Sequence, residues 1–237
     1  MIGGPPIVEI RGVIKQYGGL RPLRLTAFDV AQSDRVVLSG LDRQAAEMFM
    51  HLVTGAALPD EGVVRVAGTD TRDISTDTDW LLSLDRFGIV THRSVLLESL
   101  PVAANMALPI TLAVEPMAAE VRAQVEALAD EVELSRERLD QSAARLDAPD
   151  KLRLHLARAL ASGPGLLLLE HPTAELGDLA ARAAFGRTLA AVSERRALGW
   201  IAISEDAEFA KASGGVAHRL RPASGEVIRE HRWWSWR

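Results

Sequence analysis

The stretch Val36-Val37-Leu38-Ser39-Gly40-Leu41-Asp42-Arg43-Gln44-Ala45-Ala46-Glu47-Met48 decides the fold of this 237-residue chain. Its first four residues predict a buried strand, because a short apolar run bounded by turn residues is typical of strands covered on both faces. Gly40 ends the strand, and Asp42 stands at the N-cap of a helix whose apolar side chains recur at helical spacing up to Gly55. This order of strand, glycine turn and helix is what an α/β sheet requires.

The glycine turn is where a phosphate-binding loop would lie. Such a loop reads glycine, four residues, glycine, lysine, then serine or threonine, because the glycines let amides face phosphate, the lysine neutralises it and the hydroxyl holds magnesium. Gly40 keeps the first position, whereas Ala45, Ala46 and Glu47 stand at the second glycine, the lysine and the hydroxyl. The stretch therefore predicts the shape of the loop without its chemistry.

The rest of the chain extends the same alternation of elements. Strands are expected at 7–10, 23–30, 63–67, 87–90, 165–169, 200–204, 216–220 and 226–229, and residues 69–79 form a polar connection. Helices are expected at 116–134, 136–146, from Asp147 to 161, at 178–195 and at 206–212. We expect one domain over residues 1–237, with an antiparallel β layer at its start and a helical subdomain at about 93–147.

Composition narrows the class of protein. The chain is 48% hydrophobic and 25% charged, with a formal net charge of -5 and no cysteine. A negative chain without basic clusters is a poor nucleic-acid binder, so no nucleic-acid partner is expected. The first residues lack the pattern of a signal peptide, and no apolar run reaches membrane-spanning length. We expect a cytoplasmic protein that docks on the inner face of the cell membrane through a partner.

Several further segments stand at characteristic intervals from the glycine turn: Lys15-Gln16-Tyr17, Gly40 to Gly55, Phe87 to His92, Ala104 to Pro109, Leu146 to Asp150 followed by Ala157-Arg158-Ala159-Leu160, Leu166 to Thr173, and Ile203 to Asp206. Through these segments and their spacing, the chain resembles, over nearly its whole length, the nucleotide-binding subunits of ABC transporters, most of all those of the lipoprotein-release and macrolide-export kind. The resemblance implies a P-loop NTPase fold with a mixed sheet, an antiparallel layer and a helical subdomain.

The same resemblance shows that catalytic positions are replaced. Charges that position phosphate and water decide whether such a site hydrolyses ATP. Ala46 and Glu47 stand at the lysine and magnesium hydroxyl, and His92 at the glutamine that ends the 87–92 strand. Glu170 and His171 stand at the aspartate and glutamate after the Leu166 strand, and Glu205 replaces the switch histidine. Tyr17 and Gly40 are the positions expected to contribute to any remaining ATP binding, Tyr17 by stacking on adenine.

The signature segment, Asp147-Ala148-Pro149-Asp150, is replaced as well. In the family, serine and glycine amides at this helix start hold the γ-phosphate bound by the partner subunit. Pro149 has no amide hydrogen, and the two aspartates bring their own negative charge. We expect Asp42 and Asp147 to cap the two helix starts that nucleotide would otherwise satisfy.

Three features allow more than one interpretation. Glu47, His92 and Glu170 could bind a divalent metal without nucleotide, with His171 and Glu205 nearby, or could be hydrogen-bonded neighbours. Residues 92–109 correspond to the surface that receives a permease helix, so Val95, Leu96 and Leu97 could line a groove or belong to the core. The Trp233-Trp234-Ser235-Trp236 segment could anchor the chain at a membrane interface or on a partner, or could cover the chain's own apolar surface.

The sequence therefore predicts a degenerate ABC subunit with a structural or regulatory role in a membrane transport complex. No cofactor is expected unless nucleotide binding is retained, in which case it is ATP with magnesium. The expected partners are an integral membrane permease and a second ATPase-like subunit, either the same chain or an intact paralogue. Two alternatives remain: an ATPase subunit completed by an active partner, and a soluble scaffold or metal-binding module unrelated to transport.

Overall fold

The computed structural model describes residues 6–74 and 76–230. Its larger sheet has six strands in the order β10-β9-β3-β8-β7-β6. These are β3 (Arg35–Ser39), β6 (Phe87–Thr91), β7 (Leu166–Glu170), β8 (Gly199–Ile203), β9 (Val216–Arg221) and β10 (Glu226–Arg229). All pairs are parallel except β9 with β10. Every residue of β7 and β8 is buried, as expected for central strands of a covered parallel sheet.

A second sheet is antiparallel and has the order β2-β1-β4-β5. Its strands are β1 (Val8–Lys15), β2 (Leu23–Val30), β4 (Glu61–Val66) and β5 (Thr69–Asp70). Their buried side chains share one hydrophobic cluster with β3 and α1 (Arg43–Thr54). The mixed sheet and the antiparallel layer that the sequence predicts are therefore confirmed.

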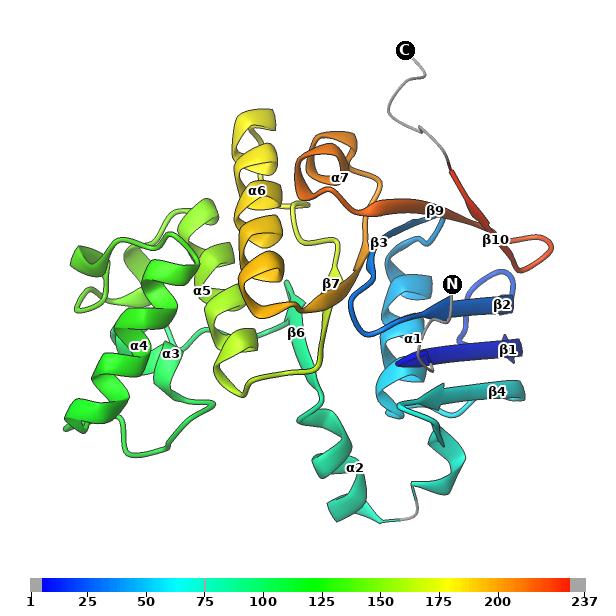
Figure 1. The fold of residues 1–237 in the computed structure, drawn as a ribbon, viewed down its shortest axis with the longest axis horizontal. Coiled ribbons are helices and arrows are strands. Elements are labelled where there is room, and N and C mark those ends of the chain that lie inside the picture. Colours follow the sequence, from blue (N-terminus) through cyan, green and yellow to red (C-terminus); the bar gives the residue numbers. More distant parts are fainter. Residues whose placement is uncertain (1–5, 75, 231–237) are drawn as a thin grey trace.

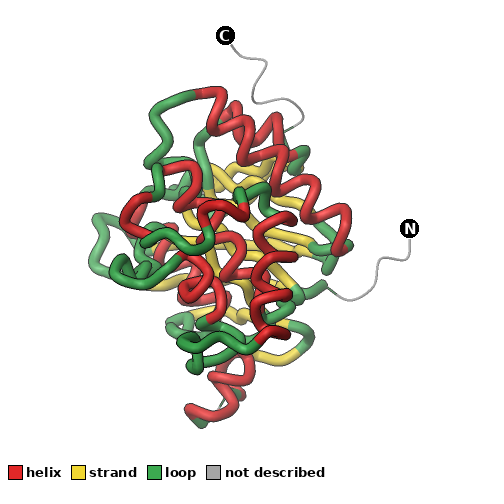
Figure 2. The backbone as a smooth tube through the Cα atoms, turned by 90° about the vertical axis from the view of Figure 1, so that its left-hand side faces the viewer, coloured by secondary structure: helices red, strands yellow, loops and turns green. Residues whose placement is uncertain are grey.

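Helices cover the larger sheet, and further helices lie beyond it at one end of the molecule. They are α5 (Ala148–Ala161), α6 (Leu179–Arg196) and α7 (Ala207–Ser213), with α3 (Val102–Ala107) and α4 (Ala119–Glu131) further out. Figure 1 shows α3 and α4 at the opposite end of the long axis from the antiparallel sheet. Seen from that helical end, the helices lie in front of the strands (Figure 2). The predicted 93–147 stretch contains α3, α4 and two 3₁₀ turns, Arg136–Arg138 and Ala143–Arg145.

Two local predictions were wrong. Residues 69–79 were expected to be a connection, but β5, a 3₁₀ turn (Thr71–Asp73) and α2 (Asp77–Leu84) occupy the region. The α2 stretch is short and acidic at its start, and none of its residues is buried although it contains Trp80, Leu81 and Leu84; the Trp80 indole N–H donates to the Thr54 carbonyl at 3.1 Å. The Trp233-Trp234-Ser235-Trp236 segment lies outside the described residues.

The expected helix at 136–146 was also wrong, because it is two separate 3₁₀ turns. Its backbone carbonyls are used by the neighbouring segment: the amides of Val102 and Ala103 donate to Gln141 at 2.9 Å and Leu139 at 2.8 Å. Tertiary hydrogen bonds thus replace those of a continuous helix.

Candidate functional site

The loop between β3 and α1 has the shape that the sequence predicts. Gly40 has φ of 89°, and a Cβ there would meet the Leu220 carbonyl oxygen at 2.2 Å, so only glycine is accommodated. Asp42 caps α1, since its carboxylate accepts a hydrogen bond from the Ala45 amide at 2.8 Å. Ala46, at the lysine position, is 0% exposed. The loop geometry is retained, and one amide at the helix start is already paired.

A second carboxylate approaches the same loop. Glu205 follows β8, and its carboxylate accepts a hydrogen bond from the Gly40 amide at 2.6 Å. A charged acceptor on a backbone N–H makes a short, strong hydrogen bond. Glu205 therefore occupies an amide of the glycine loop with a negative charge that belongs to the chain.

Arg93 forms ion pairs with Glu47 and Glu170, the two carboxylates at the magnesium hydroxyl and aspartate positions of the family pattern. Its Nη1 lies 2.7 Å from Glu47 on α1, and its Nη2 lies 2.6 Å from Glu170 at the end of β7. The Glu170 side chain is 0% exposed, whereas those of Arg93 and Glu47 are 35% and 42% exposed. The Thr91 hydroxyl also donates to Glu170, at 2.8 Å. One guanidinium thus links α1, β7 and the loop that leaves β6; we call Glu47, Arg93 and Glu170 the ion cluster.

The histidines of the site lie beside the ion cluster but do not join it. His92, His155 and His171 line a cavity of about 70 Å³ between β6 and α5. His171 has φ of 42°, and its Nε2 is buried without a partner among the described residues. Burial lowers the pKa of His171, and burial with the charges of Arg158 and Lys151 lowers that of His155 to about 4.

The predicted metal ligands are not brought together as a metal site. Within residues 6–74 and 76–230, no three His, Asp or Glu side chains are placed to hold a metal ion. Glu47 and Glu170 instead contact Arg93, and His92 is exposed. The arrangement of the described residues therefore does not support the metal interpretation.

The signature segment forms a helix start that is capped from within. Asp147 is the N-cap of α5, and its carboxylate accepts from the Asp150 amide at 2.9 Å. Pro149 lies in the first turn, as the sequence predicts. The Asp150 carboxylate in turn contacts Arg153 at 3.1 Å and Arg138 at 3.7 Å. The expected internal caps at Asp42 and Asp147 are both present.

Two further predicted residues lie at the margins. Tyr17 is partly buried against the cluster shared by the antiparallel sheet and α1, and burial, with the Asp42 charge, raises its pKa. Val95 and Leu97 are 72% and 44% exposed, whereas Leu96 packs against the helical core. The apolar residues of 95–97 are thus divided between surface and core.

Arg93 was not predicted as a site residue. The neighbouring His92 was predicted in its place, because its position resembles the family's glutamine. One signal for Arg93 was available: it follows the end of β6 closely. Parallel pairing of β6 with β7 places Thr91 opposite Glu170, so a cation just after Thr91 lies near the Glu170 carboxylate. The contact joins residues 77 positions apart, which local pattern does not reveal.

A glycine loop between a buried parallel strand and a helix, flanked by an antiparallel sheet, defines an α/β protein of the P-loop type. The chain belongs to the ABC transporter family, whose sequence model matches residues 27–174.

Several curated proteins resemble the chain. Lipoprotein-releasing system ATP-binding protein LolD 2 of Caulobacter vibrioides is 29% identical, over 76% of this chain and 80% of that protein. Methionine import ATP-binding protein MetN 2 of Burkholderia mallei is 32% identical, over 82% of this chain and 48% of that protein. Macrolide export ATP-binding/permease protein MacB 1 of Aeromonas hydrophila is 28% identical, over 86% of this chain and 32% of that protein. The chain thus spans most of LolD 2 but half or less of the other two.

Solved ATP-binding cassettes share the fold. The dimeric cassette MJ0796 in a post-hydrolysis state, bound to ADP and Pi, has a TM-score of 0.75 at 22% identity, over 94% of this chain and 97% of that chain. The structure of cbiO1 from Clostridium perfringens has a TM-score of 0.78 at 17% identity, over 95% and 88%. These likenesses confirm the predicted fold.

The family implies ATP with magnesium, and the residues of this site do not fit them. The Glu205 carboxylate lies on the loop amide where a phosphate oxygen would be held, and two anions repel. The Arg93 guanidinium lies between the carboxylates at the hydroxyl and aspartate positions, where a cation would be held. Ala46 supplies no charge for a phosphate.

Proposed function

We propose that this chain is a nucleotide-independent subunit of an ABC transport complex, with a structural or regulatory role. One observation supports the proposal above the others: the chain's own charged groups, Glu205 and Arg93, contact the loop amide and the carboxylates where a nucleotide and its metal would be held. Hydrolysis needs a polarised water as well, and His171 replaces the glutamate of the family pattern.

The proposed partners are a membrane permease and a second ATPase-like subunit. The relatives' names connect them with lipoprotein release, methionine import and macrolide export. No helix in the described part of this chain has the length and hydropathy to cross a membrane, and we propose that the chain attaches to the inner face through a permease. Val95 and Leu97 are exposed apolar side chains on the loop after β6, which suits contact with an apolar helix.

A second candidate is an ATP-binding subunit completed by an active partner. The retained φ of Gly40, which keeps the loop in its glycine-specific shape, favours it. Nucleotide would then have to displace Glu205 from the Gly40 amide and Arg93 from Glu47.

Calorimetric titration with magnesium-ATP tests the proposal. We expect no binding by the wild-type chain at millimolar nucleotide; a Kd of about 1 mM corresponds to a binding free energy of about -4 kcal/mol. The back-substituted variant Ala45→Gly/Ala46→Lys/Glu47→Ser/Glu205→His restores the loop and switch positions, so we expect it to bind more tightly than the wild type.

The same titration with the wild-type chain and a co-encoded permease or paralogue distinguishes the two candidates. Binding by the wild type alone, tighter than about 0.1 mM, would overturn the proposal, because a site so filled should reject a triphosphate. Binding only in the presence of the partner would favour the second candidate.

A further inference from the structure

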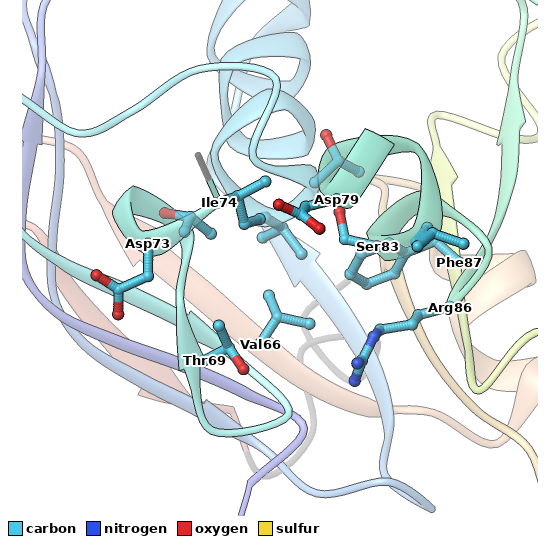
Figure 3. Close-up of a pocket in the computed structure, with 12 residues that line it drawn as sticks. Val66, Thr69, Asp73, Ile74, Asp79, Ser83, Arg86 and Phe87 are labelled. Atoms are coloured by element: carbon cyan, nitrogen blue, oxygen red, sulfur yellow. The ribbon is translucent and has the colours of Figure 1, made fainter. Parts of the chain in front are cut away.

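A larger cavity lies at the other end of α1 from the glycine loop. Its volume is about 310 Å³, and it is enclosed by the C-terminal end of α1, the β4–β5 hairpin and α2 (Figure 3). The 12 residues of α1 separate it from Gly40 by about 18 Å at the usual helical rise. Small-molecule sites begin at about 300 Å³, so the cavity can hold a compact ligand. None of its lining residues belongs to the ion cluster.

The inner wall of the cavity is apolar. Val53, Val66 and Phe87 line it and are 0%, 9% and 6% exposed. They come from α1, β4 and β6, which are fixed in the core. An apolar side chain of a ligand would find a preformed surface there.

A buried hydroxyl in the wall has no hydrogen-bond partner in the described part of the chain. Thr71 lines the cavity and is 2% exposed, and its Oγ1 makes no hydrogen bond within residues 6–74 and 76–230. Buried hydroxyls are nearly always paired, since an unpaired one loses its hydration without compensation. Because this oxygen is closed off from the cavity space, a polar group of a ligand would pair with it only after the Thr71 side chain rotates.

A carboxylate and a guanidinium, those of Asp79 and Arg86, line the cavity at separate points. Figure 3 shows Asp79, on α2, and Arg86, just before β6, on different margins of the cavity. Among the described residues, Arg86 has no side-chain ion pair, and its backbone is held by two amides that donate to its carbonyl, Gly165 at 2.9 Å and Leu166 at 3.1 Å. Within residues 6–74 and 76–230, the Asp79 carboxylate accepts a hydrogen bond from the Thr76 hydroxyl alone, at 2.7 Å. The carboxylate and the guanidinium are therefore available to groups of opposite charge on one ligand.

We propose that this cavity binds an α-amino acid with an apolar side chain. The carboxylate of the ligand pairs with Arg86, its ammonium pairs with Asp79, and its side chain packs on Val53, Val66 and Phe87. The Thr71 hydroxyl serves as an additional hydrogen-bond partner. Such a site makes the chain responsive to a small metabolite independently of nucleotide.

Calorimetry and thermal shift with a matched set of ligands test this proposal on the full chain. Leucine is the probe, leucinamide lacks the carboxylate, 4-methylpentanoate lacks the ammonium, and alanine lacks the apolar side chain. We expect leucine to bind and each of the other three to bind at least tenfold more weakly, because each removes one of the complementary groups. If 4-methylpentanoate binds as tightly as leucine, the ammonium group is not recognised and the proposed pairing with Asp79 is wrong. If leucine at about 10 mM gives no response, the cavity is not an amino-acid site.

Two variants connect binding to the cavity. Arg86→Gln should weaken leucine binding at least tenfold, whereas Arg187→Gln, the same change at an exposed residue of α6, should not alter it. Thr71→Val removes the unpaired hydroxyl with little change of shape, so we expect the ligand-free protein to melt at a higher temperature and leucine to bind several-fold more weakly. Unchanged leucine affinity in both Arg86→Gln and Thr71→Val would contradict the proposal.

Discussion

Removing Arg93 tests the ion cluster. Arg93→Met keeps much of the side-chain length but removes both ion pairs, and it leaves Glu170, 0% exposed, with Thr91 as its remaining hydrogen-bond donor. Breaking a buried pair by removing one partner costs about 3–5 kcal/mol. We expect the lower end, about 3 kcal/mol, because Arg93 is itself 35% exposed and water screens part of its charge. For a chain of this size, that lowers the melting temperature by about 6–12 °C.

Urea denaturation measures this free energy directly, and two further variants separate its causes. Glu47→Gln removes the exposed half of the ion cluster and should cost less than about 1 kcal/mol, since Glu47 is 42% exposed. Glu170→Gln combined with Arg93→Met removes the buried charge together with its partner, so it should recover a large part of the loss. If Arg93→Met costs less than about 1 kcal/mol, or if the second change brings no recovery, the guanidinium does not serve as the counter-ion of a buried carboxylate.

Further expectations concern single residues of the site. The pKa of His155 is lowered from 6.5 to about 4 in the folded chain, so the unfolded chain takes up a proton first as the pH falls. The free energy of unfolding should therefore decrease between about pH 6.5 and about pH 4, by at most about 3 kcal/mol. His155→Gln should flatten this part of a pH-dependent denaturation series. Gly40→Ala places a Cβ 2.2 Å from the Leu220 carbonyl oxygen in a left-handed backbone, so its melting temperature should fall by several degrees; an unchanged value would show that the loop can rearrange. Asp147→Ala removes the cap on the Asp150 amide and should cost about 1 kcal/mol in urea denaturation, whereas Asp147→Asn, which keeps an acceptor oxygen, should cost less.

Local pattern was sufficient for the core of the fold. The β3 strand, Gly40 and the Asp42 cap follow each other within a few residues, and each has a strong intrinsic preference, so their order predicts the loop and α1. The same holds for the Asp147 cap and the first-turn proline of α5.

The ion cluster and α2 could not be predicted in this way. Arg93 meets Glu170 only because β6 and β7 pair in parallel, and their side chains are 77 positions apart in sequence. The helix α2 has only eight residues and buries none of them, so its few apolar side chains form too short a pattern to predict a helix. Contacts between distant segments, such as the hydrogen bond from the Trp80 indole to the Thr54 carbonyl, need the folded arrangement.

Under the proposed function, the contacts that stabilise the nucleotide region are the same ones that would oppose nucleotide binding. A phosphate on the loop would have to displace Glu205 from the Gly40 amide, and a metal would have to displace Arg93 from Glu47 and Glu170. Displacing Arg93 is unfavourable because Glu170 would be left buried without its counter-ion. In a site built for ATP, amides and carboxylates remain available and the ligand completes their pairing, so ligand binding adds to stability. Here Glu205 and Arg93 of the chain itself make those pairings, and under the proposed function this ionic arrangement would maintain the fold without ligand and oppose nucleotide binding.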